Sequence, residues 1–320
     1  MVKCTRWMEL QATVESHARL AGILKAKTTF HLLNKPMEAL QEFTVSTEND
    51  VEFAKTVISS TEPEGVTPLT QHILEIRERI AEMEEDLLAN GQKVAVVIAT
   101  DGIPSDEYGE SPEEVRKAFI DALGALQLLP VWIVIRLCTN ERKVRKFYHA
   151  IDMQLERPLD SVSSFTDEAT EIRKWNSWLT YALPLHRIRE MGDERRIFDL
   201  LDERELTKDE LREFLDLLFG KSSLENAPNI HSDWKGFSSF LANVVRREGQ
   251  QWCPHSKKME YWIDLGRLHM IYGGGIVNSF RRRMSDIKVD LRELALSSNS
   301  LLEGTKRGDL LPASKNKGER

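Results

Sequence analysis

The stretch Lys93–Asp106, KVAVVIATDGIPSD, decides the fold class of this chain. Its apolar, mostly β-branched run from Val94 to Ala99 predicts a strand buried on both faces, as in the middle of a parallel sheet. Thr100, Asp101 and Gly102 follow directly where that strand ends. Open α/β sheets bind ligands at the carboxyl ends of their strands, so both position and chemistry make Asp101 a candidate site residue.

The segments around this strand alternate between strand and helix character. Pro130–Leu137, PVWIVIRL, predicts a second buried strand, and Thr70–Leu88 predicts a helix. Another helix is expected from Ser111, with this serine as its cap and Pro112 at its first position. Strands that alternate with helices indicate βαβ units, and we therefore expect an α/β fold with a doubly wound, mostly parallel sheet and flanking helices.

Composition is that of an ordinary folded protein. The 320 residues carry a formal net charge of −7, which disfavours nucleic-acid binding, and 41% of them are hydrophobic. No apolar run is long enough to span a bilayer, and the N-terminus lacks the apolar core of a signal peptide. Three cysteines without a paired motif favour a reducing compartment. A cytoplasmic location is expected, with the nucleus as the alternative.

The character of the chain changes near residue 180, where charged helices begin. A capping box over Thr207–Glu210 predicts a helix that ends at Gly220, and the segments around Trp252 and Tyr261 predict a small hairpin. We expect four parts: an α/β domain over residues 1–180, a charged helical region over 181–230, a small aromatic-containing segment over 231–290 and a disordered tail over 291–320.

Two loop motifs together resemble the von Willebrand factor type A (VWA) domain. They are Gly65–Leu69, GVTPL, before a helix, and Ala99–Gly102, ATDG, at a strand end. The resemblance covers roughly residues 5–165 and implies a metal-ion-dependent adhesion site. Transferred to this chain, Thr67 and Asp101 would bind Mg²⁺, and a carboxylate of a partner protein would complete the coordination. A hard divalent cation with few charged ligands stays open to such a carboxylate.

The sequence departs from the VWA pattern at the DxSxS motif, which in that family follows the first strand and supplies further metal ligands. Asp160–Ser164, DSVSS, comes nearest, but its serines are out of phase. In the family this motif precedes the helix that starts here near Arg6, so we expect an N-terminally truncated VWA-like chain. The missing strand would leave a central slot in the sheet, and Mg²⁺ binding is expected to be weak or absent.

Three functions stay open on the sequence. We favour an interaction or scaffold module with a partial Mg²⁺-dependent site for an exposed Asp or Glu of a partner protein. The alternatives are a hydrolase or phosphoryl-transfer enzyme that uses Asp101, and a VWA-like scaffold whose metal site is lost. No nucleophile elbow, phosphate loop or zinc-protease motif is present, so no catalytic or cofactor-binding residue is assigned.

Other polar residues are expected to have roles in loop solvation or packing. Ser105, Asp106 and Glu107 are expected to solvate their loop, with Asp106 alternatively a secondary ligand or a residue that holds the loop's shape. A structural role in packing is expected for the residues that could suggest zinc, because their spacing matches no recurring zinc motif: His231, Cys253, His255 and His269.

Overall fold

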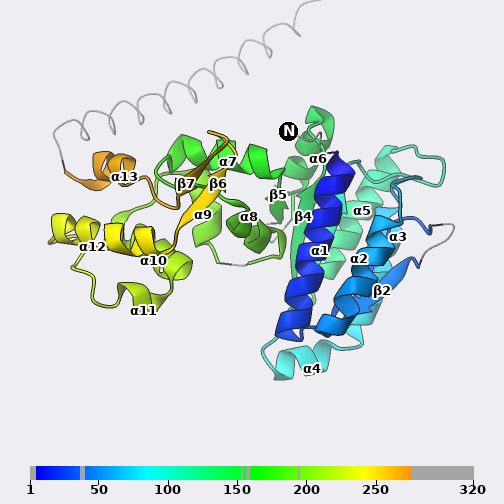
Figure 1. The fold of residues 1–320 in the computed structure, drawn as a ribbon. Coiled ribbons are helices and arrows are strands. Elements are labelled where there is room, and N and C mark those ends of the chain that lie inside the picture. The colour runs from blue at the N-terminus through cyan, green and yellow to red at the C-terminus, as the bar shows by residue number, and fades with distance from the viewer. Residues whose placement is uncertain (1–4, 37–39, 153, 156–158, 194, 275–320) are drawn as a thin grey trace, which may run out of the picture.

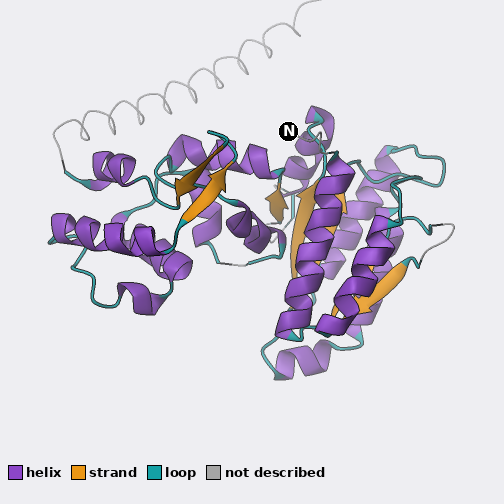
Figure 2. Cartoon of the chain, viewed as in Figure 1, coloured by secondary structure: helices purple, strands orange, loops and turns teal. Residues whose placement is uncertain are grey.

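The computed structural model describes residues 5–36, 40–152, 154–155, 159–193 and 195–274. Figures 1 and 2 show an α/β half and a largely helical half. The first half contains, in chain order, α1 (Arg6–Leu24), β1 (Thr28–His31), β2 (Glu42–Val45), the 3-10 turn η1 (Glu48–Asp50), α2 (Val51–Ser59), α3 (Leu69–Ala81), α4 (Glu84–Ala89), β3 (Val94–Thr100), α5 (Glu113–Leu126), β4 (Val131–Leu137), α6 (Arg142–Asp152) and β5 (Asp160–Val162). The second contains α7 (Phe165–Trp175), α8 (Leu183–Glu190), α9 (Ile197–Glu203), α10 (Lys208–Phe219), α11 (Lys221–Leu224), α12 (Trp234–Arg247), β6 (Gln250–Cys253), β7 (Lys258–Tyr261) and α13 (Leu265–Tyr272).

A three-stranded parallel sheet of order β3-β4-β5 forms the centre of the α/β half. β3 and β4 pair over their full length, from Val94 opposite Val131 to Thr100 opposite Leu137. Helices lie on both faces of β4. Ile133 and Ile135 join an apolar core with α3, α5 and α6, whereas Trp132 and Val134 meet the turn after α8 at Gly192. The predicted α/β class with a parallel sheet is thus confirmed.

The prediction that β3 is buried on both faces is wrong. Val96 and Ile98 face the core, but Ala95 and Val97 are exposed, Val97 by 38%. The cover over the corresponding face of β4 does not extend to Val97, and no described strand pairs with the far edge of β3. β1 and β2 form a separate antiparallel hairpin. Among the described strands, β3 therefore has one unpaired edge, and one of its faces, which carries Ala95 and Val97, is exposed.

Two predicted helices differ in detail. The helix expected over Thr70–Leu88 is divided into α3 and α4 by a break at Met83, which has non-helical dihedral angles. Ser111 does not cap α5, because Pro112 has an extended conformation and is itself the N-cap residue. Ser111 is therefore one residue too early to reach the free amides of the first turn, and no described residue hydrogen bonds its buried hydroxyl.

The second half packs around one apolar core that runs from α7 to α13, with Trp178 and Phe214 fully buried within it. It joins the predicted region 181–230 to the described part of 231–290. The hairpin β6–β7 and the capping box of Thr207 and Glu210 are confirmed. The predicted tail, 291–320, lies outside the described residues. None of the described helices has the length and apolar character that a membrane span requires.

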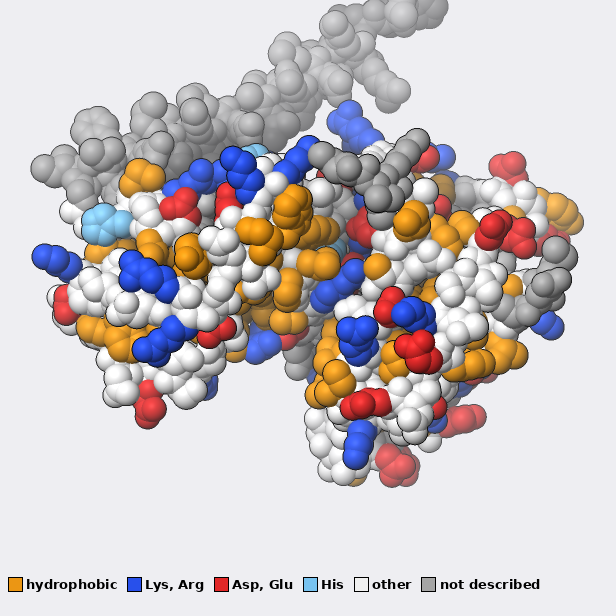
Figure 3. Space-filling model, in the orientation of Figure 1, with side chains coloured by type: hydrophobic (Ala, Val, Ile, Leu, Met, Phe, Trp, Pro, Cys, Tyr) orange, Lys and Arg blue, Asp and Glu red, His pale blue; other side chains and the backbone are white. Residues whose placement is uncertain are grey.

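Charges of both signs are mixed on the surface of the α/β half. Over α1 and α2, acidic and basic side chains lie side by side on the face shown in Figure 3. Glu15 on α1, for example, lies 3.6 Å from Arg19 and 3.5 Å from Lys55 on α2. Such exposed pairs contribute little to stability, so the packing of these helices depends on their apolar sides.

Candidate functional site

The structure brings Thr67 and the Asp101–Gly102 turn together at the carboxyl end of β3. Thr67 lies in the loop before α3, and Asp101 directly follows β3. A side-chain carbon placed on Gly102 would lie 3.1 Å from Thr67 Oγ1, closer than most such contacts in proteins. The absence of a side chain at Gly102 therefore allows the threonine hydroxyl to approach this turn.

Hydrogen bonds hold the Thr67 backbone in place from two sides. The Thr67 amide donates to Ser105 Oγ at 2.9 Å, and the Ser105 amide donates to the Thr67 carbonyl at 2.9 Å. On the other side, Asn34 Nδ2 donates to the carbonyls of Glu64 (2.9 Å) and Val66 (2.8 Å). Gly65 between them has a φ of +97°, a conformation that favours glycine.

Hydrogen bonds with Thr100 and with Tyr148 on α6 hold the turn that carries Asp101. Thr100 Oγ1 accepts a hydrogen bond from the Gly102 amide at 3.2 Å, and the buried Tyr148 hydroxyl on α6 donates to the Gly102 carbonyl at 3.1 Å. Burial raises the pKa of Tyr148 well above its usual value, so the hydroxyl stays neutral and keeps its proton for this bond. Asp101 is thus attached to a well-held turn.

The Asp101 carboxylate itself is exposed, and no described residue forms a hydrogen bond or ion pair with it. Its charge acts on Cys138, which follows β4 at the same edge of the sheet. Burial, with smaller contributions from the charges of Glu9, Asp101 and Glu190, raises the pKa of the Cys138 thiol to about 11. A protonated, buried thiol is a poor nucleophile, so Cys138 does not complete a catalytic pair with Asp101.

The N-terminal end of α1 lies at this edge too. Arg6 Nη2 donates to Asn140 Oδ1 at 2.6 Å, and Asn140 lies just beyond Cys138. Thr5 caps the helix, with its side chain accepting from the Met8 amide. The positive end of the helix dipole is therefore on the side of the sheet that carries Asp101.

Ser105, Asp106 and Glu107 were expected to solvate their loop rather than to bind metal. Ser105 also holds Thr67, as described above, and the sequence contains no signal for this long-range contact. Asp106 Oδ1 accepts from the amides of Tyr108 (3.0 Å) and Glu110 (2.9 Å). The alternative role of Asp106, holding the loop's shape, is confirmed.

The residues that could suggest zinc do not gather into a site. His231 Nε2 lies 2.7 Å from Asp209 Oδ1, while His269 Nδ1 accepts from Trp234 Nε1 at 3.1 Å, and Cys253 is buried as a free thiol. Within the described part of the chain, a different group combines ligand types at short range: His31, His72 and Glu75. In the sequence, the one local signal for this group is the spacing of His72 and Glu75 by one helical turn.

The carboxyl-edge site therefore offers two oxygen ligand types, a hydroxyl and a carboxylate. Mg²⁺ requires near-octahedral coordination by about six oxygens, so water or other groups would have to supply the rest. Comparison of the chain with known families and proteins gave no match to a family model, to a curated protein or to a solved structure.

Proposed function

We propose that this chain is a protein-interaction module of the VWA type, whose carboxyl edge presents part of a Mg²⁺-dependent site for an acidic side chain of a partner. Thr67 and Asp101 are the proposed metal ligands. The observation that carries the proposal is the approach of Thr67 Oγ1 to the Asp101–Gly102 turn, beside a carboxylate that no described residue engages.

The rigidity of both loops supports this role. A metal site needs ligands that are held before the ion arrives, and here the backbone of Thr67 and the turn of Gly102 are each fixed by hydrogen bonds. The start of α1 at the same edge gives further support. The positive end of the α1 dipole at this edge favours anionic groups there.

The open edge of β3 is consistent with the same proposal. Among the described strands none pairs with the outer edge of β3, so its backbone groups there could pair with a further strand. With Thr67 and Asp101 alone, most of the Mg²⁺ coordination sphere is left to water, so we expect weak binding.

A titration with Mg²⁺, followed by thermal unfolding, tests the ligand assignment. A ligand that binds only the native state raises stability by RT ln(1 + [L]/Kd), about 1.4 kcal/mol at tenfold excess over Kd. We expect a rise in Tm at millimolar Mg²⁺ that Asp101→Asn and Thr67→Val abolish. Glu107→Gln, an exposed substitution in the same loop, is the matched control and should keep the rise. No rise in the unmodified chain would contradict Mg²⁺ ligation by these residues.

Binding to an immobilised aspartate-containing peptide tests the interaction itself. Retention that requires Mg²⁺ and disappears with EDTA supports the metal-dependent function. Retention that is indifferent to EDTA favours the alternative of a scaffold with a lost metal site. Turnover of a phosphate ester that disappears in Asp101→Ala would instead favour the enzyme alternative.

A further inference from the structure

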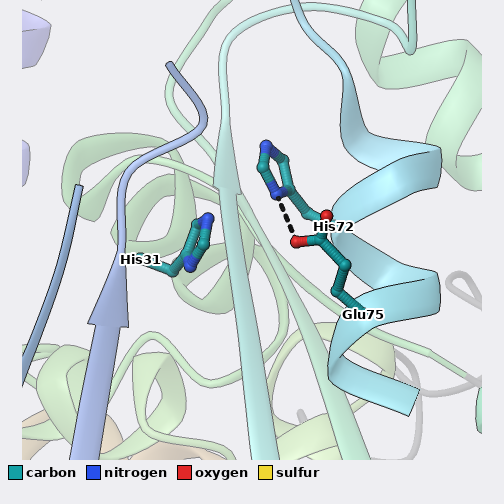
Figure 4. Close-up of side chains that lie close together, drawn as sticks. All are labelled: His31, His72 and Glu75. Atoms are coloured by element: carbon teal, nitrogen blue, oxygen red, sulfur yellow. Dashed lines mark hydrogen bonds and ion pairs between the residues drawn. The ribbon is translucent and has the colours of Figure 1, made fainter. Parts of the chain in front are cut away.

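A second group of side chains, remote from Asp101 in the sequence, has the composition of a transition-metal site. His31 ends β1, whereas His72 and Glu75 lie one turn apart on α3. Figure 4 shows the imidazole rings of His31 and His72 between these elements, with Glu75 beside His72. The planes of the two rings are tilted by 56°. The ring centroids are 4.6 Å apart, and one potential ligand atom from each of the three residues lies within 4.8 Å of the other two.

The hydrogen bond of His72 determines which of its nitrogens is free. Its Nε2 lies 2.8 Å from the carbonyl oxygen of Leu33. A carbonyl oxygen can only accept, so Nε2 carries a hydrogen, and the ring nitrogen that could bind a metal is Nδ1. That Nδ1 lies 3.4 Å from Glu75 Oε2. A metal ion that replaces the proton between these two atoms would have the lone pairs of both as ligands.

His31 is oriented by a carboxylate in the same manner. Its Nδ1 lies 3.0 Å from Glu42 Oε2, and the same oxygen accepts from Arg79 Nη1 at 2.6 Å. Because the guanidinium of Arg79 already donates to this carboxylate oxygen, Glu42 Oε2 serves as an acceptor. Nδ1 of His31 therefore carries the hydrogen, and its lone pair is on Nε2. This Nε2 is buried, and no described residue hydrogen bonds it.

Both histidines thus have the partners that metal-bound histidines have in proteins. A ligating imidazole donates its other N–H to a carboxylate or a backbone carbonyl, which fixes the tautomer and aims the lone pair at the metal. Here Glu42 plays that part for His31, and the Leu33 carbonyl plays it for His72. Glu75 is positioned as well, because its Oε1 accepts from Gln71 Nε2 at 2.9 Å.

We propose that His31 Nε2, His72 Nδ1 and a Glu75 carboxylate oxygen bind a divalent transition metal ion of the zinc class. Two imidazoles and one carboxylate suit Zn²⁺ better than Mg²⁺, which prefers oxygen ligands alone. The ion would add a further link between the β1–β2 hairpin and α3, beside the contact of Arg79 with Glu42. This site is separate from the Mg²⁺ site at Thr67 and Asp101 and does not depend on it.

Calorimetric titration of the metal-stripped full chain with Zn²⁺ tests the proposal, and Co²⁺ absorption reports on the ligands. We expect one ion per chain at this site and a Co²⁺ spectrum typical of nitrogen-containing, low-coordinate sites. Glu42→Gln should weaken Zn²⁺ binding about tenfold, as expected for a residue that orients a ligand. His72→Gln and Glu75→Gln should weaken it further.

Three control variants make the result specific. His149→Gln and Glu78→Gln change exposed residues of the same chemical types elsewhere on α6 and α3, and both should keep full affinity. Asp101→Asn should also keep it, which separates this site from the proposed Mg²⁺ site. The proposal is overturned if the unmodified chain binds no Zn²⁺, or if His72→Gln and Glu75→Gln bind it as tightly as the controls.

Discussion

Among the described residues, the helical half of the chain has one apolar core, whereas the α/β half has two. The helical core runs without interruption from α7 to α13. In the α/β half, one core lies between the parallel sheet and α3, α5 and α6, and a smaller one lies between α1, β2 and α2. The two cores belong to separate sheets, because no described strand of the β1–β2 hairpin pairs with β3. The His31, His72 and Glu75 group lies at the division between these two cores, because His31 ends β1 and the other two residues are on α3. The Thr67 and Asp101 site lies instead at the edge of the sheet core.

Buried charges on α8 connect the two halves. Arg136 on β4, 2% exposed, contacts Glu190 at 2.5 Å and Glu9 on α1 at 2.6 Å. Arg189, which is on α8 beside Glu190, pairs with Glu168 on α7 and lies 3.2 Å from Asp202 on α9. α8 therefore has ionic contacts with the sheet and α1 on one side, and with the helical half on the other.

The largest expected effect comes from breaking this connection with Glu190→Gln. The Arg136 and Arg187 guanidiniums and the His186 imidazole offset the burial of Glu190 and hold its pKa well below the usual range, so the residue is ionised in the native state. Loss of one partner of a buried ion pair costs about 3–5 kcal/mol, and because Arg136 keeps Glu9 we expect the lower end of this range. Urea unfolding measures this cost. Glu203→Gln, which removes an exposed pair with Arg196, should cost no more than about 1 kcal/mol. Equal costs for the two variants would show that α8 does not connect the halves through these charges.

The division of the α/β core is tested by Phe43→Ala. Phe43 stacks on Phe30 with centroids 5.1 Å apart and meets the edge of Phe53 at 6.5 Å. Its removal should cost about 3 kcal/mol, at the lower end for such truncations, because exposed neighbours can relax into the space. Native-state hydrogen exchange should show lost protection in α1, β1, β2 and α2 only. Phe214→Ala, in the helical core, should instead lower protection throughout α10 and α12. If Phe43→Ala affects α10 equally, the cores are coupled.

The pH dependence of stability identifies a further contact between α1 and the α8 charges. Burial, with smaller contributions from Arg187 and Arg136, lowers the pKa of His17 from 6.5 to about 4. The unfolded chain therefore binds the proton more readily, and stability must fall as pH drops from about 6.5 towards 4. The contribution is at most about 3 kcal/mol. Urea unfolding at pH 7.5 and pH 5 should show a smaller difference for His17→Gln than for the unmodified chain.

Two observations control that experiment. Asp202, whose pKa burial raises from 3.8 to about 6, acts in the opposite direction over part of the same range. Because Asp202 is present in both proteins, the difference between them isolates His17. His149→Gln, an exposed substitution on α6, should leave the pH dependence unchanged. A His17→Gln variant with the full pH dependence would show that His17 is protonated in the native state.

Local patterns in the sequence predicted much of the fold but not its long-range relations. The strands β3 and β4, the hairpin β6–β7 and the start of α10 follow from runs of apolar, turn and capping residues. The exposure of Val97 could not be predicted this way, because it depends on which distant segment covers that face. Arg136 was likewise expected in an apolar strand, and only the fold shows that Glu9 and Glu190 surround it.

The same distinction applies to the candidate sites. The approach of Thr67 to the turn at Gly102 agrees with the sequence pattern that placed both loops at one edge of the sheet, but metal binding by Thr67 and Asp101 stays a prediction. The pairing of His31 with His72 was not predictable, since β1 and α3 are far apart in sequence and their packing brings the rings together. Which ion or partner either site binds stays a prediction.

The smallest expected effect on stability comes from substitutions at the start of one helix in each half, α10 and α5. Thr207 Oγ1 accepts from the Glu210 amide at 3.3 Å, and Glu210 Oε2 accepts from the Thr207 amide at 2.8 Å, so Thr207→Ala should destabilise the protein by about 1 kcal/mol. Thr207→Ser keeps the hydroxyl and should recover most of this loss. Ser111→Ala, at the start of α5, should cost nothing or slightly stabilise, because it removes a buried hydroxyl that no described residue hydrogen bonds. Urea midpoints at neutral pH distinguish the two positions. A cost for Ser111→Ala equal to that of Thr207→Ala would mean that Ser111, and not Pro112, caps α5 in solution.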